Sequence, residues 1–248
     1  MSACGRIGFA PSKTADDATT VRHTCSAKST APDLLTINSF AFSYLDFRNT
    51  RAPLSGATIQ AYDATETVRG ETTTAADGTY TLSIATGGIA PTLSVHGSFG
   101  GDWKTDEFFD APIDTDLSAV ATDTLPFGEV PIWTKVAMGA IYSRFGTSHD
   151  PALGTVNVTT LDCSGHALGG VTVTLDPPAQ LSLYLDVDGN AALDVTGTIT
   201  PYALQLSTNV TPGPIHITAN KPGYEFAPVD IAVKAGDFNT LVELRPLM

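Results

Sequence analysis

The sequence predicts an all-β protein made of two tandem antiparallel β-sandwiches with one short connecting helix. The chain has 248 residues, more than a typical single domain of about 100–150, and 42% of them are hydrophobic, enough for two packed cores. Threonine, valine, glycine and proline are plentiful and lysine is scarce, which favours strands and turns over helices. Similar strand and turn signals also recur in the same order in both halves.

The first 36 residues (1–36) are expected to form a flexible N-terminal tether, because they are polar, rich in small residues and lack periodicity. Cys4 follows the small residues Ser2 and Ala3, as the lipid-modified cysteine does at the end of a bacterial lipoprotein signal. A full signal also carries a basic and an apolar segment before the cysteine. Cys4 is therefore a candidate lipidation site, and a chance match is the alternative.

The first sandwich is expected over residues 37–123. Tyr80, Leu82 and Ile84 alternate with polar residues after an Asp-Gly turn, which is typical of a strand with one buried face. A Gly-Gly bend and another alternating strand follow. Four residues are expected to face the core and Thr81 to face away from it; the four are Ile59, Tyr80, Leu82 and Val95.

The second sandwich is expected over residues 154–248, with the same order of strands and glycine bends. Its inward residues are predicted to be Val171, Val173, Leu206 and Ile217, and Thr172 is predicted to face away.

The linker, residues 124–153, is expected to hold an amphipathic helix with Pro131 in its first turn and Gly146 at its end. Its apolar residues recur at the spacing of one helix face: Trp133, Val136, Ala137, Ala140, Ile141 and Phe145. So short a helix is marginal alone, so we expect it to lie against one or both sandwiches, as a wedge between the domains. A recognition helix is the alternative.

The first half contains the run PLSGATIQAYDATETVRGETTTAADGTYTLSI, which resembles the carboxypeptidase regulatory-like domain, a transthyretin-like and Ig-like β-sandwich. Residues 162–165, 168–171 and 209–213 resemble a diverged member of the same superfamily. The resemblance covers residues 37–123 and 154–244. It implies the sandwich fold and an accessory role, since such domains usually accompany catalytic or transport domains without reacting themselves.

The composition restricts the partners and the location. With 13 basic against 26 acidic residues and a net charge of −13, the chain is unsuited to nucleic acid, which is bound through lysine and arginine. No apolar run is long enough for a transmembrane helix. We expect an exported protein of the cell envelope, either an outer-membrane lipoprotein or a periplasmic or extracellular protein. Its partner would be an unknown surface or periplasmic protein or a glycan.

No local catalytic pattern is found in the sequence. There is no G-x-S-x-G or H-E-x-x-H motif, and the five histidines are isolated. Two enzyme groups share the sandwich superfamily. The Tyr and His iron ligands of intradiol dioxygenases have no local counterpart, and the Tyr-Arg-Gly-Ser end of hydroxyisourate hydrolases is absent. We expect no enzymatic activity; a site assembled from distant residues is the remaining enzyme alternative.

Two loops carry candidate binding residues. Asp186, Asp188 and Asn190 place three oxygen-bearing side chains on alternate residues, which suits weak Ca²⁺ binding. The favoured alternative is an ordinary turn in which these side chains bind local backbone groups. No other cofactor is expected.

The second loop holds Trp103 between Asp102 and Asp106, where the ring could stack on a sugar and the carboxylates bind its hydroxyls. The favoured alternative is that Trp103 closes one end of the sandwich.

We also expect Cys25 and Cys163 to be unpaired, since a bridge between them would close a long loop. Together these features predict a structural or interaction role, with a carbohydrate- or calcium-binding module as the alternative.

Overall fold

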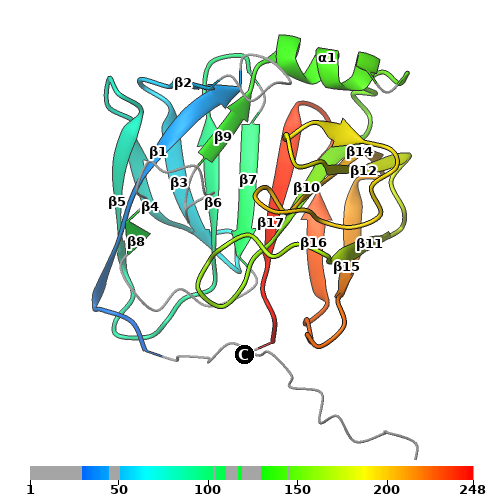
Figure 1. Ribbon diagram of the computed structural model, residues 1–248. Helices are drawn as coiled ribbons and strands as arrows, with labels where there is room; N and C mark the ends of the chain where they lie inside the picture. The colour runs from blue at the N-terminus through cyan, green and yellow to red at the C-terminus, as the bar shows by residue number, and fades with distance from the viewer. Residues whose placement is uncertain are drawn as a thin grey trace, which may run out of the picture.

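The computed structural model describes residues 30–44, 51–102, 104–109, 117–118, 130–144 and 146–247. These residues form β-strands and a single ten-residue helix, so the predicted all-β sandwich class with one short helix is confirmed. Figure 1 shows the first half of the chain on the left, the second half on the right, and strands β7 and β17 side by side between them.

A small sheet belongs to the first half alone and is centred on β1 (Leu34–Tyr44). Antiparallel to β1 run β5 (Thr79–Ala85) and β2 (Arg51–Pro53). Two further strands pair with β1 in parallel, namely β8 (Leu117–Ser118) and β9 (Val130–Trp133). Every second residue of β5 is buried, as its alternating sequence predicts.

A second small sheet belongs to the second half. It has three antiparallel strands, β11 (Thr172–Asp176), β15 (Gly213–Asn220) and β16 (Val229–Val233), with β15 in the middle. The outer strands β11 and β16 are therefore its two edges.

The two halves share one nine-stranded sheet with the order β13-β12-β14-β10-β17-β7-β6-β3-β4. Its strands are β13 (Ala191–Ala192), β12 (Leu181–Leu185), β14 (Leu204–Val210), β10 (Gly154–Thr160), β17 (Phe238–Leu244), β7 (Lys104–Phe109), β6 (Leu93–Ser98), β3 (Thr58–Asp63) and β4 (Val68–Thr73). Its halves meet where β17 pairs with β7 in parallel.

The strand pairings of the two halves correspond. β1 pairs antiparallel with β5 and parallel with β9, and β10 pairs in the same way with β14 and β17. The triplet β3-β6-β7 likewise corresponds to β11-β15-β16. The exception is that β4 pairs with β3, whereas β12 pairs with β14. Each half is thus a version of one two-sheet unit, and each gives a different one of its sheets to the shared sheet.

The two apolar cores lie on opposite faces of the shared sheet. Ile59 and Val95 point into a core with β1, β5 and β9, whereas Val156 and Val158 point into a core with β11, β15 and β16. Cross-strand neighbours share a face, and the register from Ile59 through β6, β7 and β17 leads to Thr155, not to Val156. The small sheets therefore cover opposite faces, offset along the shared sheet.

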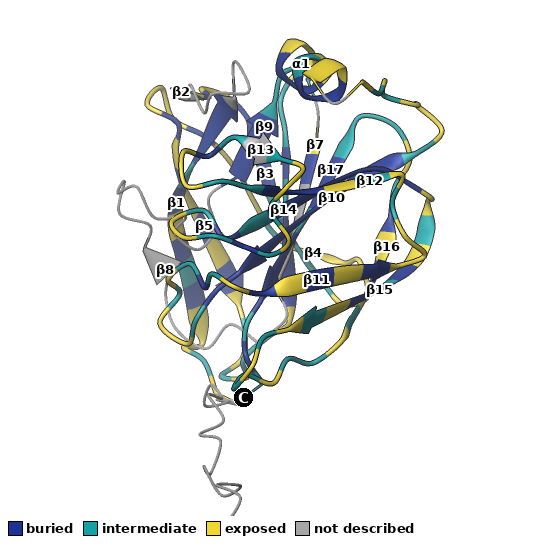
Figure 2. Cartoon of the chain, turned by 45° about the vertical axis from the view of Figure 1, so that its right-hand side comes forward, coloured by how far each residue is buried: buried dark blue, intermediate teal, exposed yellow. Residues whose placement is uncertain are grey.

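The predicted inward residues are buried and both predicted outward threonines are exposed. Leu206 is the exception in detail, because it is buried against the helix and not in the core of the second sandwich. Both faces of β10, β14 and β17 are covered, and Figure 2 shows these strands largely in dark blue.

The helix, α1, spans Lys135–Arg144, and its buried face overlaps the predicted one only at Ala137 and Ile141. Pro131 lies in β9, and the hydroxyl of Thr134 caps the helix by accepting the N–H of Ala137 (3.0 Å). Val136 is consequently 77% exposed. The chain stays extended to the end of β9, which delays the helix start and sets its buried face at Ala137, Met138, Ile141 and Tyr142. The predicted face member Phe145 lies outside the described residues.

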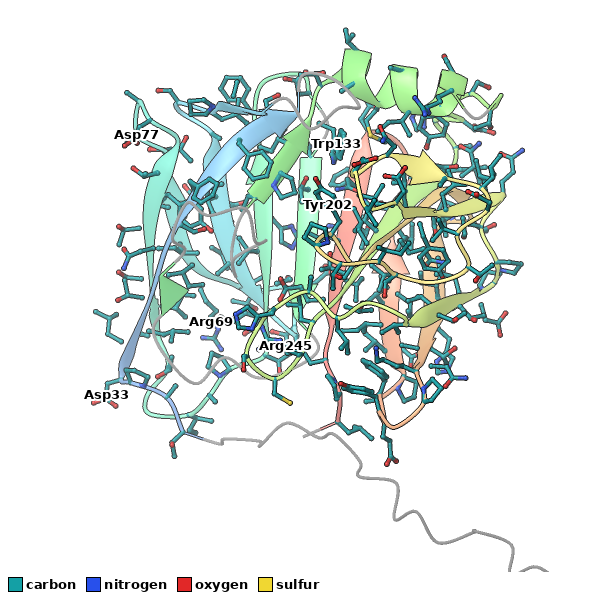
Figure 3. All side chains as sticks on the ribbon, in the orientation of Figure 1. Asp33, Arg69, Asp77, Trp133, Tyr202 and Arg245 are labelled. Carbon is teal, nitrogen blue, oxygen red and sulfur yellow. The ribbon has the colours of Figure 1, made fainter. Side chains whose placement is uncertain are left out.

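Helix α1 packs on the second half of the shared sheet. Met138, Ile141 and Tyr142 contact Leu206 of β14, with Trp133 beside them. The Tyr142 hydroxyl lies 3.0 Å from the hydroxyl of Thr155, and burial raises the pKa of this phenol. Figure 3 shows Trp133 at the junction between β9 and α1.

Candidate functional site

A groove, here called the β16 groove, lies between β16 and the face of β3 and β6 that points away from the first core. Its volume is about 540 Å³. Its main lining side chains and strand residues are Tyr62, Ser94, His96, Asp230, Ala232 and Lys234. The groove exists because the sheet containing β16 covers only the second half of the shared sheet.

The floor of the groove is aromatic and polar. Tyr62 and His96 have ring centroids 4.1 Å apart with the rings tilted by 38°. Ser94 Oγ lies 3.1 Å from Nε2 of His96, and the Tyr62 hydroxyl donates to Oε1 of Gln60 at 2.8 Å. Strand alternation explains this arrangement, because these residues face away from Ile59 and its neighbours in the core.

The Ser94–His96 contact has the atoms of a nucleophile and a base, but strand geometry is enough to produce it. The two residues are two positions apart on one face of β6, and Ser94 is buried. The floor as a whole can stack against flat or apolar groups and exchange hydrogen bonds with them.

The rim of the groove includes a turn organised by Asp63. Its carboxylate accepts hydrogen bonds from the Thr65 hydroxyl (2.6 Å) and the Thr67 N–H (3.1 Å), and it pairs with Arg69 (2.7 Å). These donors hold the pKa of Asp63 well below its usual range, with the Thr65 hydroxyl as the largest cause. Asp63 therefore stabilises the loop and is already engaged within the chain.

The loop predicted to bind calcium is organised by Asp186. Oδ1 of Asp186 accepts the backbone N–H groups of Asp188 and Asn190, each at 2.9 Å, and these donors lower its pKa, Asn190 most. Gly189 has φ of 77°, which closes the turn. No cluster of three His, Cys, Asp or Glu suited to a metal occurs within the described residues.

Substitutions at Asp186 and Asp188 separate turn capping from calcium binding. In calcium-free buffer we expect Asp186→Ala to lower the melting temperature by a few degrees, because two backbone donors lose their acceptor. Asp188→Ala should have little effect there, since Asp188 contributes to the turn through its backbone N–H. If the loop binds Ca²⁺, millimolar calcium raises the melting temperature of the native chain and Asp188→Ala abolishes the rise. Scanning calorimetry with and without calcium decides, and a curve that calcium does not move leaves the loop an ordinary turn.

The other predicted site residues are not brought together by the described structure. Trp103 and Cys4 lie outside the described residues, as does Cys25. Asp102 lies in the turn after Phe99, which accepts its N–H at 3.1 Å. Asp106 lies within β7, between β6 and β17. The carbohydrate hypothesis for this loop therefore remains a prediction.

Cys163 is disulfide-bonded, so the prediction that it is unpaired is wrong. That prediction rests on the length of the loop that a bridge would close. That reasoning is weak, because the free-energy cost of closing a loop grows only slowly with its length. Cys163 is exposed, between Asp162 and the turn at Gly165.

The residues of the β16 groove are not among those predicted from the sequence. A signal was present: Gln60 and Tyr62 in β3, and Ser94 and His96 in β6, are the outward positions of strands whose inward positions were assigned correctly. What the sequence did not reveal is that β16 lies beside that face.

No protein-family model matches the chain, and no curated protein matches its sequence. Solved structures give remote similarities. The TIE protein of Bacillus anthracis is 9% identical, with a TM-score of 0.26, over 86% of this chain and 34% of that protein. The shaft pilin SpaA of Lactobacillus rhamnosus GG is 11% identical, with a TM-score of 0.24, over 89% of this chain and 99% of the pilin.

A streptococcal ancillary pilin is 10% identical, with a TM-score of 0.25, over 87% of this chain and 63% of that one. The chain thus spans about a third of the TIE protein. At TM-scores this low we draw nothing about function from these similarities. Within the described residues, no helix has the length and hydrophobicity needed to cross a bilayer.

Proposed function

We propose that the chain is an exported, non-enzymatic structural and interaction protein whose two sandwiches form one stiff body that presents the β16 groove. The observation that carries this proposal is the parallel pairing of β17 with β7, over six residue pairs. Domains joined by a linker usually move relative to each other. Here such movement would break main-chain hydrogen bonds in the middle of a nine-stranded sheet.

Two measurements test this proposal. ¹⁵N relaxation should give one rotational correlation time for the amides of both halves, and two different values would contradict the stiff body. Biotinylation of intact producing cells should label the chain but not a cytosolic control protein. Labelling that appears only after lysis would contradict export to the surface.

The disulfide at Cys163 supports export, because disulfides persist mainly in oxidising compartments. The sequence contains three cysteines, so a partner within the chain is Cys4 or Cys25. We further propose that Cys4 carries a lipid and that the sandwiches are related to carboxypeptidase regulatory-like domains. The choice of partner bears directly on the lipid anchor, since a cysteine in a disulfide cannot carry a lipid on its sulfur.

Peptide mapping of the non-reduced, alkylated protein is expected to link the Cys163 peptide to the Cys25 peptide, leaving Cys4 available. The same digest after reduction is the control and should release both peptides. A link between Cys163 and Cys4 would exclude the lipid anchor while leaving export intact. A fully alkylated Cys163 in protein purified without reductant would remove the support for an oxidising compartment.

A carbohydrate-binding role is the second candidate, favoured by the Tyr62–His96 pair in the groove floor. Aromatic rings with nearby hydrogen-bonding groups suit the faces and hydroxyls of sugars. Titration with simple sugars, followed by the NMR signals of Tyr62 and His96, tests it. Tyr62→Ala should abolish any shift, and Tyr224→Ala, an aromatic substitution outside the groove lining, is the control.

A further inference from the structure

We propose that the outer edge of β16 accepts an extended, basic segment of a partner protein, which adds as a fourth strand to the sheet β11-β15-β16. This inference rests on the proposed interaction role and specifies the partner of the β16 groove.

The backbone of β16 has hydrogen-bonding groups directed away from its own sheet. Pro214 of β15 lies opposite Ala232 and has no N–H, so this pair must be one of the non-hydrogen-bonded pairs of the antiparallel ladder. The N–H and C=O groups of Ala232, and those of Asp230 two residues earlier, therefore point away from β15. Both residues line the groove. Among the described residues, no hydrogen bond is made to these outward backbone groups of Asp230 and Ala232.

The opposite edge of the same sheet, on β11, differs from β16 because it is capped by side chains at Val173. On β11, the N–H of Val173 donates to the Tyr184 hydroxyl (2.9 Å), and the Val173 carbonyl accepts from Nε2 of Gln205 (3.2 Å). Side-chain caps of this kind prevent a strand edge from pairing with another chain.

The first half shows what an edge of this kind accepts. β7 is the counterpart of β16, and its outer edge is paired along its length by the strand β17. In the second half, the groove lies beside β16 at the place where β17 lies beside β7.

The groove has suitable geometry for an added strand. Paired strands lie about 4.8 Å apart and packed sheets about 10 Å apart, so a strand beside β16 would lie above the face of the shared sheet next to it. The side chains on that face are Tyr62, Ser94 and His96. Alternate side chains of the added strand would pack on these residues.

The charge of the groove favours a basic segment. Asp63, Glu66 and Asp230 line it, against Lys234, and the whole chain carries a net charge of −13. Asp63 and Asp230 are already paired, with Arg69 and His216, so the excess is modest. Its main effect is to favour association with basic over acidic segments.

The test uses a synthetic eight-residue peptide of alternating valine and threonine with lysine at both ends. N-methylation of every second residue leaves only one edge able to pair. With the full-length protein and saturating peptide, we expect hydrogen exchange of the Asp230 and Ala232 amides to slow by about tenfold or more. The Ile231 amide, which faces β15, is the internal reference and should not change.

Two substitutions at one position give the matched control. Ala232→Pro removes the outward N–H without removing a bond to β15, and proline is tolerated at such edge positions. It should weaken peptide binding by about tenfold or more relative to Ala232→Thr, which also enlarges the side chain but keeps the N–H. Slow exchange of Ile231 in the proline variant shows that β16 is still folded. If that signal is lost, the exchange measurement on the native chain decides alone.

The outcomes are distinct. Failure of the native protein to bind the peptide at millimolar concentration overturns the inference, as does binding that Ala232→Pro does not weaken. Equal binding of the same peptide with glutamate ends overturns the basic preference. Sugar binding at Tyr62 without protection of Asp230 and Ala232 would assign the groove to glycans instead. The relaxation and biotinylation tests do not involve the peptide, so the proposed function can survive or fail separately.

Discussion

Gly97→Ala is expected to lower the free energy of unfolding by about 3 kcal/mol, because β9 lies directly over this position of β6. A Cβ at Gly97 would overlap Cγ1 of Val130 and lie 3.5 Å from Cδ1 of Ile132. Val130 and Ile132 are fully buried and cannot move aside into solvent. Urea denaturation of the purified variant measures the change, with an unchanged slope as the sign of a two-state comparison.

A second substitution turns this into a test of the position of β9. In Gly97→Ala/Val130→Ala the new methyl group occupies space that the valine vacates, so the two changes should couple favourably by about 2 kcal/mol. Gly139→Ala in α1 is the control, because a Cβ there meets nothing within 4 Å. It should stabilise the helix by up to about 1 kcal/mol. Additive effects of Gly97→Ala and Val130→Ala would show that β9 does not cover β6.

The succession of strands and turns along the chain could be predicted because it depends on local patterns. The alternation of Tyr80, Leu82 and Ile84 identified a half-buried strand and its buried face correctly. The shared sheet could not be predicted in this way. It depends on pairing between residues 104–109 and 238–244, which are far apart in sequence, and no local pattern specifies that partner. The start and part of the buried face of the helix were predicted wrongly for a related reason, since the pairing of β9 with β1 keeps residues 130–133 extended.

The candidate site was harder to predict than the fold. The sequence shows concentrated polar or aromatic groups only in loops, at Asp186 and Trp103. The groove instead combines outward residues of β3 and β6 with the edge of β16, three strands that are separated in the chain. The clue that β16 has an open edge is Pro214, whose meaning depends on knowing that Ala232 lies opposite.

Asn239→Leu is expected to lower the free energy of unfolding by about 3 kcal/mol, because it removes one partner of a buried pair. Nδ2 of Asn157 donates to Oδ1 of Asn239 at 2.7 Å, across the β10–β17 ladder at the centre of the shared sheet. Asn157 is 3% exposed and Asn239 is fully buried. Without Asn239, the amide of Asn157 would be left in the interior with no partner for its donor groups.

The double substitution Asn157→Leu/Asn239→Leu should recover most of this loss and bring stability to within about 1 kcal/mol of the native chain. The reason is that the pair is itself imperfect: Oδ1 of Asn157 and Nδ2 of Asn239 are buried without a hydrogen-bond partner among the described residues. Replacing both partners of such a pair removes its desolvation cost along with its bond. Asn38→Leu, on the exposed face of β1, is the control and should change stability by no more than about 0.5 kcal/mol. A double variant less stable than either single variant would mean that these amides are satisfied in solution, and that the centre of the shared sheet is wetter than its burial indicates.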